Sequence, residues 1–194
     1  MYYYVRDDGS SDSTFDIINK WSKVLTIKLF KEKNVGPAQS FWTLLCKSEI
    51  QADYYAFCDQ DDVWDSNKLE VAVNKLKEDY CLYFSNCRII DEYGDIVKEE
   101  RLIKEPDLSI KNLFISGITQ GCSMVFTQKL RSEILNLNIQ TIPMHDIVLM
   151  LYALFLGKIY YDSKPRFGYR IHSNNVVAKQ NKLNIYNLKK TVWI

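Results

Sequence analysis

The pattern that most constrains the fold is a short strand that ends in acidic residues and leads into a helix, repeated along the chain. Residues 1–5 are an apolar run of β-forming residues, and after a polar loop apolar residues recur at helical spacing over 15–21. Residues 54–58 are apolar, residues 59–62 are mostly acidic, and a helical pattern follows over 69–76. Alternating strands and helices predict an α/β fold with a mostly parallel central sheet flanked by helices.

The rest of the chain continues this alternation less regularly. We expect further strands at residues 24–30, 81–90, 122–127, 158–161 and 167–172. We expect further helices at residues 38–48, 109–115, 129–135 and from about residue 145. At 194 residues the chain is large enough to bury one core without disulfides or a structural metal, so we predict a single domain.

Charge and cysteine content exclude several classes of protein. Lys and Arg number 25 against 24 for Asp and Glu, which gives no electrostatic case for a nucleic-acid partner. The five cysteines have no zinc or redox spacing and indicate buried thiols in a reducing cytoplasm. The longest apolar run, residues 147–156, is about half of the ~20 residues that cross a bilayer, so we expect a soluble protein.

Acidic residues gather after two strands, with Asp7 and Asp8 after the first and Asp59, Asp61 and Asp62 after a later one. Ligands of parallel sheets bind beyond the carboxyl ends of strands, so both groups should face one crevice. Carboxylates brought together repel one another unless a cation offsets them, and oxygen ligands suit Mg²⁺ or Mn²⁺ bridging to phosphates. Helix capping would explain one acid after a strand, but it does not require the four acids within residues 59–65.

Several segments match a known family in order and spacing. Arg6–Thr14, Asn34–Gly36 and Phe57–Trp64 resemble the donor-site motifs of family 2 glycosyltransferases. Met144–Asp146, which begins an apolar helix, and Tyr169–Val176 resemble the rhamnosyltransferase-like branch of that family. The similarity covers roughly residues 1–178.

The resemblance implies a GT-A fold and an inverting, metal-dependent transfer of a sugar from a nucleoside-diphosphate sugar to a glycan or lipid-linked acceptor hydroxyl. Peripheral association with the inner face of the plasma membrane is left open. The nucleotide and donor site implied by the resemblance consists of Asp7, Asp8, Gly9, Ser10, Asn34, Gly36, Asp59 and Asp61. The implied ligands of Mg²⁺ or Mn²⁺ are Asp61, Asp62 and His172.

Asp146 is the candidate general base, because an attacking acceptor hydroxyl must lose its proton and a carboxylate can take it. Its position in the first turn of a helix also suits a purely structural role, since the helix dipole stabilises the charged form there. The neighbouring His145 is interpreted as a polar surface residue.

The start of the chain departs from the family pattern. Family members begin with another strand before the Asp-Asp-Gly-Ser motif, so we expect an N-terminally truncated domain with an exposed sheet edge and an incomplete nucleotide pocket. Within the domain, the resemblance implies a donor half at residues 1–107, an acceptor and catalytic half at 108–178, and a C-terminal helical extension at 179–194.

Two other functions remain open from the sequence. Asp59–Val63 also fits the motif of haloacid-dehalogenase-like phosphatases, in which Asp59 would be the nucleophile and Asp61 the general acid and base. That reading leaves Asp7, Asp8 and Gly9 unexplained. A non-catalytic, truncated sugar-nucleotide binder is the other alternative.

Overall fold

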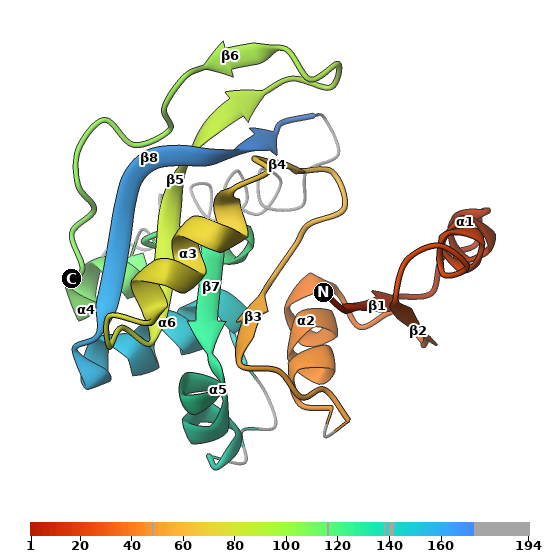
Figure 1. Ribbon diagram of the computed structural model, residues 1–194, viewed down its shortest axis with the longest axis horizontal. Helices are drawn as coiled ribbons and strands as arrows, with labels where there is room; N and C mark the ends of the chain where they lie inside the picture. The colour runs from red at the N-terminus through yellow and green to blue at the C-terminus, as the bar shows by residue number, and fades with distance from the viewer. Residues whose placement is uncertain (48, 116, 138, 140–141, 173–194) are drawn as a thin grey trace, which may run out of the picture.

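The computed structural model describes residues 1–172 except for residues 48, 116, 138, 140 and 141 (Figure 1). The strands are β1 Tyr3–Asp7, β2 Ile27–Lys31, β3 Tyr54–Ala56, β4 Val63–Trp64, β5 Leu82–Ile90, β6 Ile96–Lys98, β7 Met124–Thr127 and β8 Ile159–Arg170. The helices are α1 Thr14–Trp21, α2 Pro37–Leu45, α3 Lys68–Leu76, α4 Ile110–Ile115, α5 Gln128–Leu135 and α6 His145–Leu156, with a 3₁₀ turn, η1, at Gly121–Ser123. The predicted extension at 179–194 and the Ser173–Val176 part of the last motif lie outside the described residues.

The strands form two separate sheets. β1 and β2 pair in parallel, while the larger sheet has the order β3-β7-β5-β8-β4, with β6 paired to β5. In the larger sheet only β5 and β8 run parallel among the described pairs. The predicted α/β class is confirmed, but the sheet is mixed rather than mostly parallel. Apolar periodicity identifies a strand without fixing its direction or its neighbours, which is why the sequence did not indicate this.

The two strands predicted at residues 158–161 and 167–172 form one continuous strand, β8. It pairs with β5 from Leu82 opposite Ile159 to Ile90 opposite Arg170. The polar residues between the predicted strands are accommodated by register shifts near Ser85 and Asn86. A bulge of this kind bends a strand without ending it, so the polar interruption in the sequence was a poor boundary.

Helices cover both faces of the larger sheet, as predicted. Along β5 and β7, Tyr83 and Val125 pack with Ala72 and Leu76 of α3. The residues on either side of these two point to the opposite face of the sheet, where they pack in the main core with α2, α4, α5 and α6. They are Leu82, Phe84, Met124 and Phe126. Figure 1 shows α3 in front of the sheet and α6 behind it. The period of two along the strands thus divides the core into two layers.

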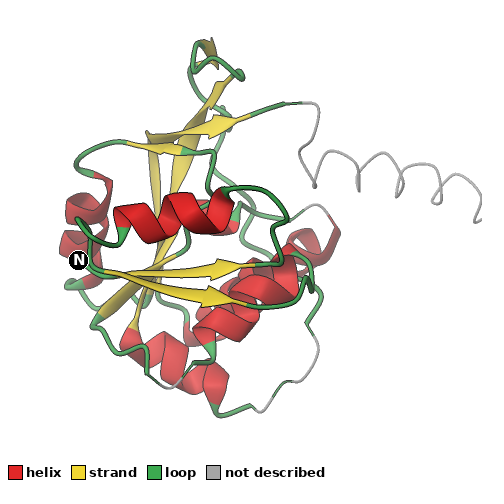
Figure 2. Cartoon of the chain, turned by 90° about the vertical axis from the view of Figure 1, so that its right-hand side faces the viewer, coloured by secondary structure: helices red, strands yellow, loops and turns green. Residues whose placement is uncertain are grey.

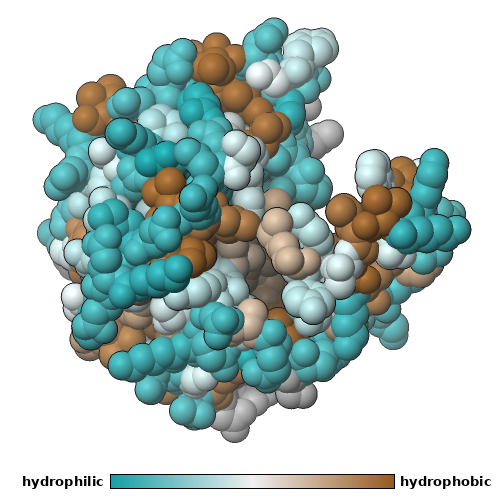
Figure 3. Space-filling view, in the orientation of Figure 1, coloured by the Kyte–Doolittle hydropathy of each residue, from teal (hydrophilic) through white to brown (hydrophobic). Residues whose placement is uncertain are grey.

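The N-terminal unit of β1, α1 and β2 projects from the rest of the molecule (Figure 1). Figure 2 shows its two strands side by side in front of the larger sheet. α1 has no buried residue, and Ile17 and Trp21 are more than half exposed. Figure 3 shows the resulting hydrophobic surface on this lobe. The unit therefore has much less apolar packing than the six-stranded part.

α6 is twelve residues long. Across the described part of the chain, no helix combines the length and the apolar character that crossing a membrane requires.

Candidate active site

A compact group of acidic side chains lies beyond the carboxyl end of β3. One carboxylate oxygen from each of Asp59 and Asp62 and the Sγ of Cys122 lie within 4.8 Å of one another. Cys122 belongs to η1, which leads into β7, and β7 pairs with β3. The strand pairing therefore brings Cys122 to the acidic loop. Sequence analysis predicted the two acids but missed the cysteine, because the pairing of β3 with β7 leaves no sequence signal.

The shared environment perturbs all three groups. Burial, and then the charge of Asp62, raises the pKa of Asp59 to about 6. Burial also raises the pKa of Asp62, whose Oδ2 is buried without a hydrogen-bond partner among the described residues. Burial raises the pKa of the Cys122 thiol strongly, so the thiol is neutral at physiological pH. The group therefore has two carboxylates that a cation would stabilise and one neutral sulfur.

The end of β8 holds the acidic loop in place. The backbone N–H of Arg170 donates to Asp62 Oδ1 at 3.1 Å, and its Nε donates to the carbonyl of Asp61 at 2.8 Å. His172 Nε2 lies 3.0 Å from Asp61 Oδ2. The three predicted metal ligands thus lie in adjoining groups, with Asp61 paired to His172 and Asp62 grouped with Asp59.

Asp146 lies in the first turn of α6, close to the acidic group. Its charge contributes to the raised pKa of Asp59, and its Cβ lies 3.5 Å from where a methyl group on Gly121 would stand. Burial raises the pKa of Asp146, against the hydrogen bonds from backbone amides, including that of Ile147 at 2.8 Å, which lower it. Burial therefore outweighs the stabilisation of the charged form expected at a helix start.

The interpretation of His145 as a surface residue is wrong. Only 5% of His145 is exposed, and its ring lies 4.5 Å from the ring of Phe41 and 4.7 Å from that of Phe57, measured between centroids. A methyl group on Gly121 would stand 2.5 Å from its Nε2. Burial lowers the pKa of His145 to about 4, so its ring is neutral at physiological pH. His145 therefore packs in the core against Phe41 and Phe57, directly before Asp146 at the start of α6.

The second predicted acidic group lies in the N-terminal unit. Asp7 is 3% exposed, and its Oδ1 accepts a hydrogen bond from the N–H of Ser10 at 2.9 Å. The hydrogen bonds from Ser10 lower the pKa of Asp7. Its Oδ2 is buried without a hydrogen-bond partner among the described residues. The hydrogen-bonding capacity of this buried oxygen is therefore left unused by the described residues around it.

Asp8 connects the first motif to the second. Its two carboxylate oxygens accept hydrogen bonds from the N–H groups of Val35 and Gly36, each at 3.0 Å, and it is also paired with Arg6. Gly9 has a φ of +84°, and a methyl group there would stand 3.1 Å from the Asn34 nitrogen. The six predicted donor-site residues of this unit therefore form one cluster at the start of α2.

Lys68 is a buried charge that sequence analysis missed. It is the first residue of α3 and is 0% exposed, and its Nζ donates to the carbonyl of Cys122 at 2.6 Å. Burial lowers the pKa of Lys68 to about 8. Its place before an apolar helical pattern gave it the appearance of an ordinary surface lysine.

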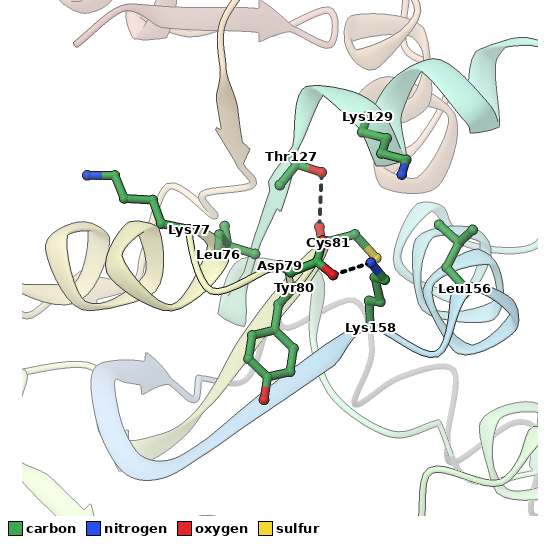
Figure 4. A pocket seen from close by; sticks show the side chains of 9 residues that line it. All are labelled: Leu76, Lys77, Asp79, Tyr80, Cys81, Thr127, Lys129, Leu156 and Lys158. Carbon is green, nitrogen blue, oxygen red and sulfur yellow. Dashed lines mark hydrogen bonds and ion pairs between the residues drawn. The ribbon is translucent and has the colours of Figure 1, made fainter.

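A separate pocket of about 330 Å³ lies at the opposite end of the sheet (Figure 4). It is found where β5 and β8 begin and β7 ends, and Lys129 and Lys158 line it together with Leu156. Lys158 is paired there with Asp79. None of the predicted site residues lines this pocket, so it is distinct from the candidate site.

Comparisons with known proteins identify the family. The model of glycosyl transferase family 2 matches residues 3–134. The chain is 27% identical over 191 residues to the dTDP-rhamnosyl transferase RfbG of Shigella flexneri, covering 90% of this chain and 64% of that protein. The chain thus spans a little under two thirds of this relative's length.

Solved structures show the same fold at low identity. Staphylococcus aureus TarS 1-349 in complex with UDP superposes with a TM-score of 0.63 at 18% identity, over 88% of this chain and 51% of that one. The mannosyltransferase PcManGT from Pyrobaculum calidifontis, in complex with GDP-Man and Mn²⁺, superposes with a TM-score of 0.61 at 14% identity, over 100% of this chain and 56% of that one.

The family match also decides between the competing interpretations of the acidic motif. It includes both the Asp7–Gly9 segment and the Asp59–Asp62 segment, and the phosphatase alternative explains only the second. That alternative is therefore not favoured. Because the match covers more than half of the chain, and because the fold is that of GT-A enzymes, this chain belongs to glycosyl transferase family 2.

Proposed function

We propose that this chain forms the donor-binding and catalytic part of an inverting, metal-dependent glycosyltransferase, with Asp59 and Asp62 at its metal site and Asp146 as its general base. The observation that carries the proposal is the group of carboxylates beyond β3. Asp59 and Asp62 lie together with raised pKa values, and Asp146 is near enough to raise that of Asp59. Such a group is stabilised by a cation or by a ligand that donates hydrogen bonds.

The residues present fit a hard divalent cation such as Mg²⁺ or Mn²⁺. Asp59 and Asp62 offer carboxylate oxygens, and the buried Asp62 Oδ2 lacks a hydrogen-bond partner among the described residues. Asp61 and His172 adjoin this pair and complete the proposed set of ligands. A cation bound here would offset the negative charge of a diphosphate leaving group.

The N-terminal cluster is proposed to hold the nucleoside. Asp7 has a buried Oδ2 without a hydrogen-bond partner among the described residues, the N–H of Ser10 donates to its other oxygen, and Gly9 lies against Asn34 in the same loop region. Asp8 acts through the backbone, because it fixes the N–H groups of Val35 and Gly36. RfbG is named as a dTDP-rhamnosyl transferase, TarS was solved with UDP, and PcManGT was solved with GDP-Man. These proteins differ in their nucleobase, so experiment must identify the nucleobase that this chain binds.

The proposed chemistry is a single displacement. The oxygen of the acceptor hydroxyl forms a bond to the anomeric carbon while the bond from that carbon to the diphosphate oxygen breaks. Asp146 takes the proton that the hydroxyl loses, and a pKa raised by burial makes it a better base near neutral pH. Displacement in one step inverts the configuration. We propose a glycan or lipid-linked acceptor, and a lipid-linked one would place the reaction at the inner face of the plasma membrane.

The division into a donor half and an acceptor half is proposed as functional only. Strands from both halves alternate in the larger sheet, where β7 lies between β3 and β5. The two halves therefore share one core.

The test is release of nucleoside diphosphate from UDP-, GDP- and dTDP-sugars, each assayed with Mn²⁺ and with EDTA. We expect release from one nucleotide class with Mn²⁺ only, and its loss in Asp62→Asn. Asp53→Asn is the matched control, because Asp53 is an exposed aspartate just before the other end of β3. Equal release in EDTA would contradict the metal requirement.

A further inference from the structure

Lys68 occupies a position that is unfavourable for a lysine. It is the first residue of α3, where the helix dipole disfavours positive charge, and it is 0% exposed. A buried ammonium loses its hydration and can donate three hydrogen bonds. The Nζ of Lys68 donates one of these to the Cys122 carbonyl at 2.6 Å. Further interactions must therefore offset the cost of burying this charge.

Two aromatic rings supply part of that compensation. The Nζ of Lys68 lies 3.5 Å from the ring centroid of Trp64 and 4.8 Å from that of Phe167. Trp64 belongs to β4, which directly follows the acidic loop, and Phe167 is its partner on β8. The electron-rich faces of aromatic rings attract an ammonium, and the attraction is stronger where water is excluded. Lys68 therefore connects α3 to the two strands that hold the acidic loop.

The acidic group supplies the opposite charge. Cys122 links the two directly, since its carbonyl accepts from Lys68 and its thiol lies with the carboxylates of Asp59 and Asp62. Lys68 interacts electrostatically with both aspartates. The buried ammonium and the two carboxylates thus form one charged unit, in which the lysine neutralises part of the negative charge.

We propose that Lys68 is a positioning residue that acts as an internal counter-cation of the Asp59–Asp62 group and weakens its binding of a divalent cation. This inference rests on the proposed metal-dependent function. With Lys68 in place, a divalent cation meets two carboxylates whose charge is already partly compensated. A weaker site holds the metal and nucleoside diphosphate less tightly after transfer, which favours release of the product.

The test is the affinity for Mn²⁺ alone, measured by electron paramagnetic resonance of the free ion in the wild type, Lys68→Met and Lys68→Gln. Both variants should bind Mn²⁺ about tenfold more tightly, because each removes a fixed positive charge near the ion. Lys68→Gln keeps a donor for the Cys122 carbonyl, and it gives the answer if Lys68→Met does not fold. Circular dichroism of the metal-free proteins establishes folding.

Lys75→Met is the matched control. Lys75 lies on the same helix, over the ring of Tyr160 at 5.0 Å, and pairs with Glu78 away from the acidic group. It should leave Mn²⁺ affinity unchanged. A purely structural role for Lys68 predicts weaker binding in its variants, so equal or weaker binding in a folded variant overturns the inference alone. Absence of Mn²⁺ binding in the wild type and in all variants would overturn both this inference and the proposed metal site.

Discussion

The two acidic groups of this protein look alike in sequence and differ in how their charge is stabilised. Asp7 and Asp8 are held by hydrogen bonds from backbone N–H groups of Ser10, Val35 and Gly36. Asp59 and Asp62 lie against each other, and burial raises the pKa of both. Hydrogen bonds lower the pKa of Asp7 instead.

Runs of aspartate that follow strands therefore serve different purposes in the two parts of this protein. A carboxylate that accepts amide hydrogen bonds, as Asp7 does, or that also pairs with an arginine, as Asp8 does with Arg6, has its charge offset within its own loop region. A pair of carboxylates that repel each other needs a cation or a proton. We therefore expect substitutions in the N-terminal group to affect loop stability and nucleoside binding, and those in the central group to affect metal binding and turnover.

The largest effect on turnover is expected from substitution of Asp146. Such an effect would show that the central group acts in catalysis as well as in binding. Asp146→Asn keeps the size of the side chain but cannot accept the proton, so turnover should fall by roughly 10²- to 10⁴-fold. Donor affinity should be retained, because the base acts on the acceptor. Steady-state kinetics and calorimetry with the nucleoside diphosphate separate the two quantities.

Asp16→Asn is the control for a helix-dipole effect, since Asp16 is the first-turn acid of α1. It should change stability slightly and leave turnover unchanged. Near-native turnover in Asp146→Asn, with lower helix stability, would assign Asp146 the same structural role as Asp16.

The next largest effect is expected at Gly121, the residue against which His145 and Asp146 pack. In Gly121→Ala the added methyl group would stand 2.5 Å from His145 Nε2, so the ring and the start of α6 must move. Displacement of the proposed base by about 1 Å should lower turnover about a hundredfold. Gly9→Ala is the counterpart in the N-terminal group, where the strained loop should weaken nucleotide binding more than turnover. Equal effects on both quantities in the two variants would remove the distinction between the groups.

A smaller effect is expected at Asp8 and concerns stability. Asp8→Ala removes the acceptor of the Val35 N–H, one of the two acceptors of the Gly36 N–H, and the ion-pair partner of Arg6, which together should lower the free energy of unfolding by about 2 kcal/mol. Urea denaturation measures this change. Asp12→Ala is the control, because Asp12 is exposed and its hydrogen bond from the N–H of Thr14 is local to the loop before α1. A loss no larger than that of the control would show that Asp8 does not organise this loop.

The smallest expected effect is on the free energy of unfolding, and its sign should differ between substitutions of Asp59 and Asp7. Burial raises the pKa of Asp59 to about 6 from its usual 3.8, so between these values the folded protein binds more protons than the unfolded one. Its stability therefore falls as pH rises from about 4 to about 6. In EDTA at pH 7, Asp59→Asn should be more stable than wild type, by about 1 kcal/mol after allowance for partial exposure.

Asp7 should behave in the opposite way. Hydrogen bonds from Ser10 lower its pKa, so its stabilising contribution is present at neutral pH and is lost as pH falls through that lowered pKa. Asp7→Asn should therefore be less stable than wild type at pH 7. Urea denaturation of both variants at pH 4.5 and pH 7 checks the signs. A change of the same sign in the two variants at pH 7 would contradict the comparison.

Sequence analysis predicted most elements and the acidic residues, because these depend on local patterns. The strand over residues 54–58 and the acids after it follow from apolar runs and charge. Cys122, Lys68 and the burial of His145 were missed for a common reason. Each depends on which strands pair and which helices cover them, as when β7 brings Cys122 to Asp59. Local periodicity contains no information on these long-range contacts.

The position of the bound cation directly tests whether Asp59 and Asp62 form the metal site. Crystals of the protein grown with Mn²⁺ and a nucleoside diphosphate would give an anomalous difference map at the manganese edge. We expect one strong peak at the carboxylates of Asp59 and Asp62, with the nucleoside near Asp7. A manganese peak at Asp7 and Asp8, or a bound nucleotide with no peak at Asp59 and Asp62, would contradict this expectation.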